Sequence, residues 1–131
     1  MQIVVGVALV HQGRVLAARR CYPADSAGRW EFPGGKVAQG ETPAEAAERE
    51  VGEELGCAIA LTDWLEPEVE IRDGLVLRVA TARLLDGEPI PQHGEHDAVR
   101  WLRADQLGAV DWLPADRPFT GLLANSLEAP H

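Results

Sequence analysis

Residues 35–57 read GKVAQGETPAEAAEREVGEELGC and hold the clearest structural signal in the chain. They predict a helix that begins after Thr42, because threonine is a good N-cap, Pro43 suits the first helical position and Glu45 completes a capping box. Gly56 ends this helix, since glycine readily adopts the left-handed conformation of helix C-termini. Apolar residues at helical spacing predict the face that packs on the core: Ala44, Ala47, Val51 and Leu55.

Three glutamates share another face of the same helix. Glu50, Glu53 and Glu54 stand at i, i+3 and i+4, where like charges repel by roughly 0.2–0.5 kcal/mol per pair. They also lie in the C-terminal half, where the helix dipole disfavours anions. A solvated acidic face is the ordinary explanation, but the glycine-rich turn ahead of the helix carries Lys36, the only lysine. Clustered carboxylates suit Mg²⁺, or Mn²⁺ in its place, so we expect a metal site here.

Strands and turns are predicted on both sides of this helix. Apolar, β-branched runs predict the strands, and glycine, proline and aspartate mark the turns. Strands, a helix, further strands and a closing helix predict a mixed α+β sandwich. The predicted strands are residues 3–10, 15–18, 30–32, 58–61, 68–72, 75–85 and 99–102, with a loop at 21–28, a break at 33–35, a helical turn at 104–107 and a closing helix at 118–126.

The composition suits one compact soluble domain over residues 1–131, as monomer or homodimer. No apolar run approaches the ~18 residues of a membrane span and no basic leader is present, so we expect a cytoplasmic protein without a membrane partner. The net charge of −9 argues against polymeric nucleic acid, which needs a basic face. Cys21 and Cys57 stand far apart, which argues against a disulfide scaffold or zinc site but leaves one bridge open.

The helix and the turn before it resemble the Nudix box, G-x5-E-x7-R-E-U-x-E-E-x-G-U, in which U is a bulky aliphatic residue. The one departure is Cys57 at the last position; cysteine behaves as a small buried hydrophobe, so we expect it to affect packing rather than chemistry. The segments WEFPGGK, residues 30–36, and WLPADRP, residues 112–118, resemble the MutT branch of this family. The matched box positions are Gly35, Glu41, Arg49, Glu50, Val51, Glu53, Glu54 and Gly56.

The resemblance implies both a fold and an activity. The fold is a Nudix-type α/β/α sandwich, with a mixed β-sheet between helices. The activity is that of the MutT branch, whose members cleave nucleoside triphosphates to the monophosphate and pyrophosphate. In that reaction the metals neutralise phosphate oxygens and activate a water that attacks the β-phosphorus.

The resemblance also implies a set of catalytic and metal-binding residues. Glu53 is the first choice for orienting or deprotonating the water, with Glu50 or Glu95 as alternatives. Glu95 is expected as the distal carboxylate, since in this branch a glutamate from a late loop approaches the metals; the plain alternative is an exposed loop acid. The implied metal ligands are the carbonyl oxygen of Gly34 and the carboxylates of Glu50, Glu53, Glu54 and Glu95.

Several neighbours are expected to support these groups. Arg49 should pair with a box glutamate and so orient it, and Glu41 should tie the loop to the start of the helix. His93 and His96 flank Glu95 and either could hold it in place, although isolated loop histidines are more often simply exposed.

Substrate contacts are expected from the glycine-rich turn and from residues near it in sequence. Lys36 and Arg20 should contact phosphates, although a solvated strand end is the plain alternative for Arg20. Phe32 and residues 3–5 would form an apolar wall for the base, or simply belong to the core. The full expected set is Arg20, Glu31, Phe32, Pro33, Gly34, Gly35, Lys36, Arg72 and Asp116.

Asp116 is the residue expected to select the base. An ionised aspartate only accepts hydrogen bonds, and the 4-amino group of cytosine is a donor. Oxidised guanine presents an acceptor beside a donor, and a carboxylate would leave that acceptor unpaired. We therefore expect CTP, dCTP or a 5-methylated cytosine nucleotide as substrate, as in the cytidine-preferring MutT relatives. Two alternatives stay open for Asp116: it could accept from the two donors of guanine, or it could merely cap the last helix.

Two other functions compete with this one. The first is sanitation of the nucleotide pool by hydrolysis of 8-oxo-dGTP or of a broad range of triphosphates. The second is a non-catalytic nucleotide sensor, which the complete set of box carboxylates disfavours, because degenerate members of such families typically lose them.

Overall fold

The computed structural model describes residues 2–66, 68–92 and 94–128. Within these residues eight strands form one mixed sheet, whose main path runs β3-β2-β1-β7-β5. The strands are β1 (Gln2–His11), β2 (Arg14–Arg20), β3 (Trp30–Glu31), β4 (Gly34–Lys36), β5 (Ala58–Trp64), β6 (Val69–Arg72), β7 (Leu75–Asp86) and β8 (His96–Leu102). The helices are α1 (Pro43–Leu55) and α2 (Arg117–Glu128), with short 3₁₀ helices η1 (Ala104–Ala109) and η2 (Pro114–Asp116).

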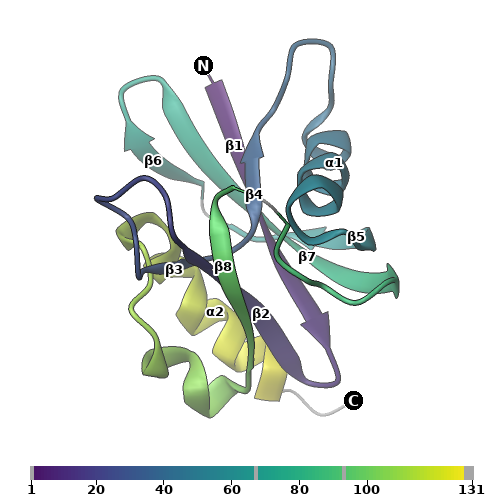
Figure 1. Cartoon of the computed structure of the whole chain (residues 1–131), viewed down its shortest axis with the longest axis vertical. Helices are drawn as coiled ribbons and strands as arrows, with labels where there is room; N and C mark the ends of the chain where they lie inside the picture. The colour runs from purple at the N-terminus through teal and green to yellow at the C-terminus, as the bar shows by residue number, and fades with distance from the viewer. Residues whose placement is uncertain (1, 67, 93, 129–131) are drawn as a thin grey trace.

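Helices α1 and α2 cover opposite faces of the sheet (Figure 1). Alternate residues of β1 point to opposite faces, so Val7 packs in the cluster under α1 and Ala8 in the cluster under α2. Leu55 contributes to the first cluster and Phe119 to the second. The predicted α/β/α sandwich with a mixed sheet between helices is therefore confirmed.

One edge of β1 is divided between two partners. Residues 10–11 pair with β2 next to the hairpin turn, whereas residues 4–6 pair with β4. The other edge pairs in parallel with β7 from Gln2 to Val10. Strand β2 continues away from β1 and pairs instead with β3 and β8. The sheet therefore separates into two arms on this side of β1.

Helix α1 has the predicted ends. The Thr42 hydroxyl accepts a hydrogen bond from the Glu45 amide, and the Glu45 carboxylate accepts one from the Thr42 amide. Gly56 adopts the left-handed conformation at the C-terminus of the helix. The buried stripe differs from the prediction at one position, because Ala44 in the first turn is only partly buried whereas Ala46 is fully buried.

The largest differences from the predicted strands concern β4, β5 and β8, whereas the other strand ends differ by one or two residues. The expected break at 33–35 contains β4, because the glycines let this backbone pair closely with β1. Strand β5 extends to Trp64. Strand β8 begins at His96 rather than at residue 99, and its polar start hides the strand from a hydrophobic pattern.

The two cysteines are free, and Cys57 is buried in the core beside α1 as expected. None of the helices among the described residues is long and apolar enough to cross a membrane.

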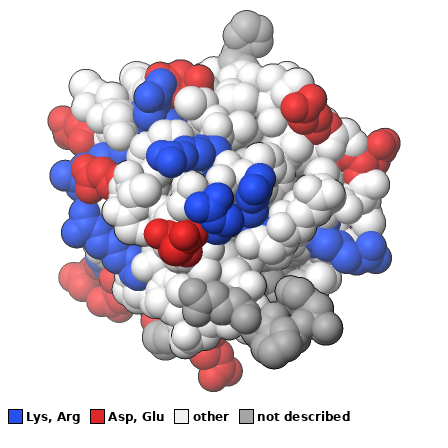
Figure 2. All heavy atoms as spheres, turned by 90° about the horizontal axis from the view of Figure 1, so that it is seen from below, with Lys and Arg blue, Asp and Glu red and all other residues white. Residues whose placement is uncertain are grey.

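The net charge of −9 is unevenly distributed. Figure 2 shows the end of the molecule that carries the β1–β2 turn, where basic side chains gather near the centre and acidic side chains lie mostly toward the rim. A hollow lined by Arg14, Arg103 and Asp105 involves this turn. The average charge of the chain therefore does not describe each of its faces.

Replacing the N-cap should weaken the protein measurably. We expect Thr42→Ala to lower the free energy of unfolding by about 1 kcal/mol, because it leaves an amide of the first turn without its partner. Urea denaturation measures the change, and Glu48→Ala, an exposed substitution on the same helix, is the control. Equal stability of Thr42→Ala and the control would contradict the capping role.

Candidate active site

A cleft opens between the two arms of the sheet. Its larger part is a cavity of about 820 Å³ whose lining includes residues 4–6 of β1, 34–36 of β4 and Arg20 of β2. A smaller hollow of about 310 Å³ lies beside α1. Both are lined by Glu50 and Glu95, so the two hollows meet at these carboxylates. The cleft therefore joins the glycine-rich turn to the acidic face of α1.

The three box glutamates lie in very different environments. Glu53 is 60% exposed at its side chain, Glu50 is 19% exposed, and Glu54 is only 10% exposed. All three line the smaller hollow together with Glu95. The structure thus brings together the four carboxylates that the sequence singled out.

Arg49 neutralises part of this cluster. Its guanidinium donates to Glu50 at 2.8 Å and to Glu53 at 3.2 Å, as the sequence predicted. It also donates to Glu41 at 2.7 Å. Glu41 in turn accepts from the Ala38 amide, so it ties the loop to the helix. The hydrogen bond from Arg49 lowers the pKa of Glu41 to about 2, and the Ala38 amide adds to this effect.

Glu54 differs from these glutamates. Both of its carboxylate oxygens are buried, and neither makes a hydrogen bond to any residue that the structure describes. Burial and, to a lesser degree, the neighbouring carboxylates of Glu31, Glu95 and Glu50 together raise the pKa of Glu54 to about 9. A buried carboxylate among other carboxylates is unfavourable unless a cation joins it. The residues present therefore fit a divalent cation with oxygen ligands.

The backbone of β4 approaches this cluster closely. A Cβ atom on Gly35 would stand 2.5 Å from the carboxyl carbon of Glu50, and one on Gly34 would stand 1.9 Å from the Val5 carbonyl oxygen. Only glycine fits at position 34, where the close atoms belong to the main chain, whereas a side chain at position 35 would displace the Glu50 carboxylate. The main chain of β4 at Gly35 therefore lies next to Glu50, one residue after Gly34, whose carbonyl was expected to bind metal.

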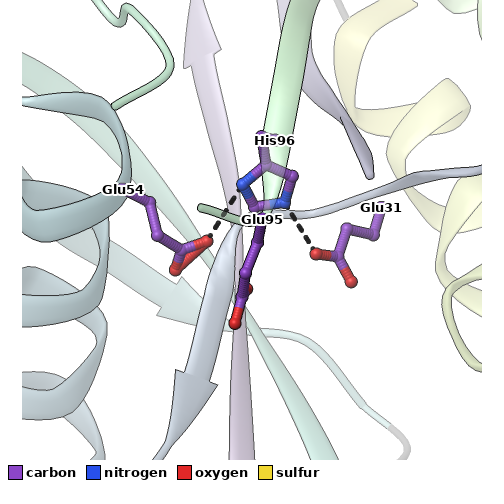
Figure 3. Close-up of side chains that lie close together, drawn as sticks. All are labelled: Glu31, Glu54, Glu95 and His96. Carbon is purple, nitrogen blue, oxygen red and sulfur yellow. Dashed lines mark hydrogen bonds and ion pairs between the residues drawn. The ribbon is translucent and has the colours of Figure 1, made fainter. Parts of the chain in front are cut away.

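A second group of polar side chains faces α1 across the cleft (Figure 3). Glu31 accepts a hydrogen bond from Arg20 at 2.8 Å and contacts the His96 ring at 2.8 Å. Arg20 also lies 3.5 Å from Glu95. Arg20 is therefore part of the cleft and not a solvated strand end.

His96 is a correction to the sequence prediction. An exposed loop histidine was expected, but the side chain is only 2% exposed, because His96 pairs with Arg20 at the start of β8. Ligand atoms of His96, Glu31, Glu54 and Glu95 all lie within 4.8 Å of one another. His93, the other expected neighbour of Glu95, lies outside the described residues.

Asp116 lines the far part of the cavity and is 5% exposed. Burial raises its pKa well above the ordinary value, and Glu31 raises it further, whereas the Phe32 amide and Arg20 act in the opposite direction. Burial therefore favours the neutral form of Asp116 more than in an exposed aspartate, an effect that the sequence analysis did not consider. Helix α2 begins one residue later, and no capping hydrogen bond from the Asp116 side chain is present among the described residues.

The remaining expected contacts divide into two groups. Phe32 lines the cavity beside Val4 and Val5, and its ring packs against Trp112 with centroids 4.7 Å apart, an aromatic pair that the sequence analysis missed. Arg72 is exposed at the end of β6 and is not among the residues that line the cavity. The cavity is also lined by Glu31, Gly34, Gly35 and Lys36. Pro33 lies between these residues in sequence, but it is buried and does not line the cavity.

Comparison with known proteins gives a consistent result. The model of the NUDIX domain family matches residues 1–123. The chain is 43% identical over 129 residues to the "Putative 8-oxo-dGTP diphosphatase 2" of Mycobacterium tuberculosis, covering 96% of this chain and 90% of that protein. It is 30% identical over 115 residues to the CTP pyrophosphohydrolase of Escherichia coli, covering 88% and 85%. Among solved structures, the Escherichia coli ORF135 protein superposes with a TM-score of 0.76 at 30% identity, covering 98% of this chain and 91% of that one.

The unpaired carboxylate of Glu54 should be visible in the pH dependence of stability. The pKa of Glu54 is about 9 in the folded protein against an ordinary value of 4.5, so the protonated side chain stabilises the folded state. This contribution to the free energy of unfolding is fully present below about pH 4.5 and is lost progressively as the pH rises to about 9. In EDTA, we expect wild type to lose about 1–3 kcal/mol more than Glu54→Gln between pH 5 and pH 9. Urea denaturation at both pH values measures this difference. Parallel pH profiles for the two proteins would contradict the burial of an uncompensated acid.

Proposed function

Because the chain belongs to the Nudix family and is a nucleotide pyrophosphohydrolase, we propose that it hydrolyses nucleoside triphosphates to the monophosphate and pyrophosphate with Mg²⁺, and that it prefers cytosine nucleotides. CTP, dCTP and 5-methyl-dCTP are the candidate substrates. The observation that carries the base preference is Asp116, the one polar side chain that is buried among the described residues lining the cavity.

The box glutamates and Glu95 would hold the metal. Divalent metal use is general to Nudix hydrolases, and we propose Mg²⁺, with Mn²⁺ able to replace it, because the proposed ligands are carboxylates and the backbone carbonyl of Gly34. When bound, the metal would neutralise phosphate oxygens and lower the pKa of a coordinated water. Support for this assignment comes from the buried oxygens of Glu54, which have no hydrogen-bond partner among the described residues.

Glu53 is proposed to orient or deprotonate the attacking water. It is the most exposed of the three box glutamates, so it can reach a water in the open hollow. Arg49 contacts Glu53 from one side and restricts its position. Glu50 is held more tightly by Arg49 and by the neighbouring backbone of Gly35, which suits a fixed ligand better than a mobile base. Glu95 remains the alternative base.

Arg20 and Lys36 are proposed to contact the phosphates. Both line the cavity near the place where it meets the carboxylates, Arg20 from β2 and Lys36 from β4. The Nε atom of Arg20 is buried and has no hydrogen-bond partner in the part of the chain that the structure describes. An anionic phosphate beside Arg20 and Lys36 would offset the strong negative charge of the cleft.

Cytosine suits Asp116 in either protonation state. An ionised carboxylate accepts a hydrogen bond from the 4-amino group. A neutral carboxyl group accepts from the same amino group through its carbonyl oxygen and donates to N3 through its hydroxyl. The other buried side chains that line the cavity are apolar, among them Phe32 and Leu77. Because unpaired polar groups are costly in such surroundings, a base with few polar atoms is favoured.

8-oxo-dGTP is the second candidate substrate. Its N7–H and O6 form a donor and acceptor pair that fits a neutral Asp116, and burial favours that neutral form. The 43% identity to the Mycobacterium tuberculosis relative also supports it. An ionised Asp116 would leave O6 unpaired, so this candidate depends on protonation in a way that cytosine does not.

Removing the proposed base should slow the chemical step. We expect Glu53→Gln to lower kcat by about 10²–10⁴-fold with little change in KM, because the substrate would still bind while the water is no longer activated. Pyrophosphate release under saturating Mg²⁺ measures this, and Glu48→Gln on the exposed side of α1 is the matched control. Undiminished release in both Glu53→Gln and Glu54→Gln would overturn the metal-site proposal.

Competition between dCTP and 8-oxo-dGTP tests the base assignment. We expect dCTP to have the larger kcat/KM by at least about tenfold, and the ratio to rise with pH in wild type as Asp116 ionises. In Asp116→Asn the ratio should stay the same at each pH at which wild type is assayed, because the amide does not ionise and always offers a donor and an acceptor. A strong preference for 8-oxo-dGTP at every pH would reject the cytosine assignment. A ratio that follows pH equally in both proteins would reject Asp116 as the reader.

A further inference from the structure

His96 occupies a closed position between the two sides of the cleft. It is among the most buried polar side chains described, and it comes from β8, whereas its neighbours Glu54 and Glu31 come from α1 and β3 (Figure 3). The pairing of His96 with Arg20 fixes its backbone beside β2. The amide of Cys21 donates to the carbonyl oxygen of Glu95 at 2.7 Å and fixes the preceding residue as well.

The two ring nitrogens of His96 face different carboxylates. Nε2 lies 2.8 Å from Glu31, and Nδ1 lies 3.4 Å from Glu54. The Glu31 oxygen that contacts Nε2 already accepts a hydrogen bond from Arg20, so we assign Nε2 as the donor in its own contact with this oxygen. The contact with Glu54 is longer and is not a hydrogen bond, since both Glu54 oxygens lack hydrogen-bond partners among the described residues. The ring is therefore held by its hydrogen bond with Glu31, and it limits the space available to the Glu54 carboxylate.

Glu31 continues this connection toward the substrate. The same oxygen that contacts His96 accepts a hydrogen bond from Arg20 at 2.8 Å. Arg20 is further fixed by its hydrogen bond to the Tyr22 carbonyl oxygen at 2.7 Å. A continuous series of contacts thus runs from Arg20 through Glu31 and His96 to Glu54.

We propose that His96 is a positioning residue with two separable roles: its Nε2 side holds Glu31 in place for Arg20, and its Nδ1 side restricts the positions that Glu54 can take as a metal ligand. The proposal rests on the metal role proposed above for Glu54. Residues that hold a ligand in place typically change metal affinity or activity by 10- to 100-fold when replaced. His96 would therefore influence metal binding and substrate binding through different atoms.

Asparagine and glutamine separate the two roles. The amide of asparagine reaches the place of Nδ1, and the longer glutamine reaches the place of Nε2. We expect His96→Gln to weaken Mn²⁺ binding about tenfold while KM stays within about twofold. We expect His96→Asn to give the reverse, a KM raised about tenfold with Mn²⁺ affinity nearly unchanged. Calorimetry without nucleotide gives the Mn²⁺ affinity, and initial rates give KM and kcat.

The controls distinguish this proposal from the proposed function. Exposed His11 is the matched site, and His11→Gln should change neither quantity. If Glu54→Gln leaves Mn²⁺ affinity unchanged, the metal role of Glu54 fails. If Glu54→Gln weakens Mn²⁺ binding but His96→Gln does not, only the positioning role fails. Equal losses in both His96 variants would also overturn the divided role, since simple packing or direct ligation by the ring affects both alike.

A measurement on the wild-type protein makes the test independent of folding of the variants. Nitrogen-15 spectra of the histidine rings should show His96 as one fixed tautomer, protonated at Nε2. Adding Mg²⁺ should move the Nδ1 resonance more than the Nε2 resonance, because Nδ1 faces Glu54. Averaged tautomers, or equal movement of both resonances, would overturn the proposal.

Discussion

The division of one edge of strand β1 between β2 and β4 is the constraint on which the cleft depends. Only the last residues of β1 pair with β2, and residues 4–6 are left for β4. Gly34 makes that second pairing possible, since any side chain there would collide with the carbonyl oxygen of Val5. The two arms of the sheet then line one cavity, with the main chain of β4 on one side and β2 on the other.

The same arrangement buries the carboxylate of Glu54 at a position that does not favour folding. Arg49 pairs with Glu41, Glu50 and Glu53, whereas Glu54 is buried and has no hydrogen bond to any of the described residues. A carboxylate in that position destabilises the metal-free protein, so its presence is better explained by binding than by stability. His96 adds to this restriction because its ring occupies the space beside Glu54 and is itself held by Glu31. The proposed metal ligand Glu54 and the proposed phosphate contact Arg20 are therefore connected through His96 and Glu31.

Local rules predicted the parts of the fold that depend on neighbours in sequence. The capping box at Thr42 and the stop at Gly56 follow from residues within a few positions, and both are present as expected. The β-branched run of β1 likewise predicted its strand. Strand β4 and the early start of β8 were missed, because each exists through pairing with a distant strand and neither has an apolar pattern of its own.

The sequence by itself determined the family resemblance, the two-sided packing of the sheet and the common face of Glu50, Glu53 and Glu54, since these depend on residue type and on spacing along one element. The tertiary structure decided which of these carboxylates is buried and unpaired, because burial depends on segments far apart in the chain. It also brought His96 against Glu31, 65 residues earlier. The raised pKa of Asp116 has the same origin: the amino acid is visible in the sequence, but its desolvation is a property of the folded cavity.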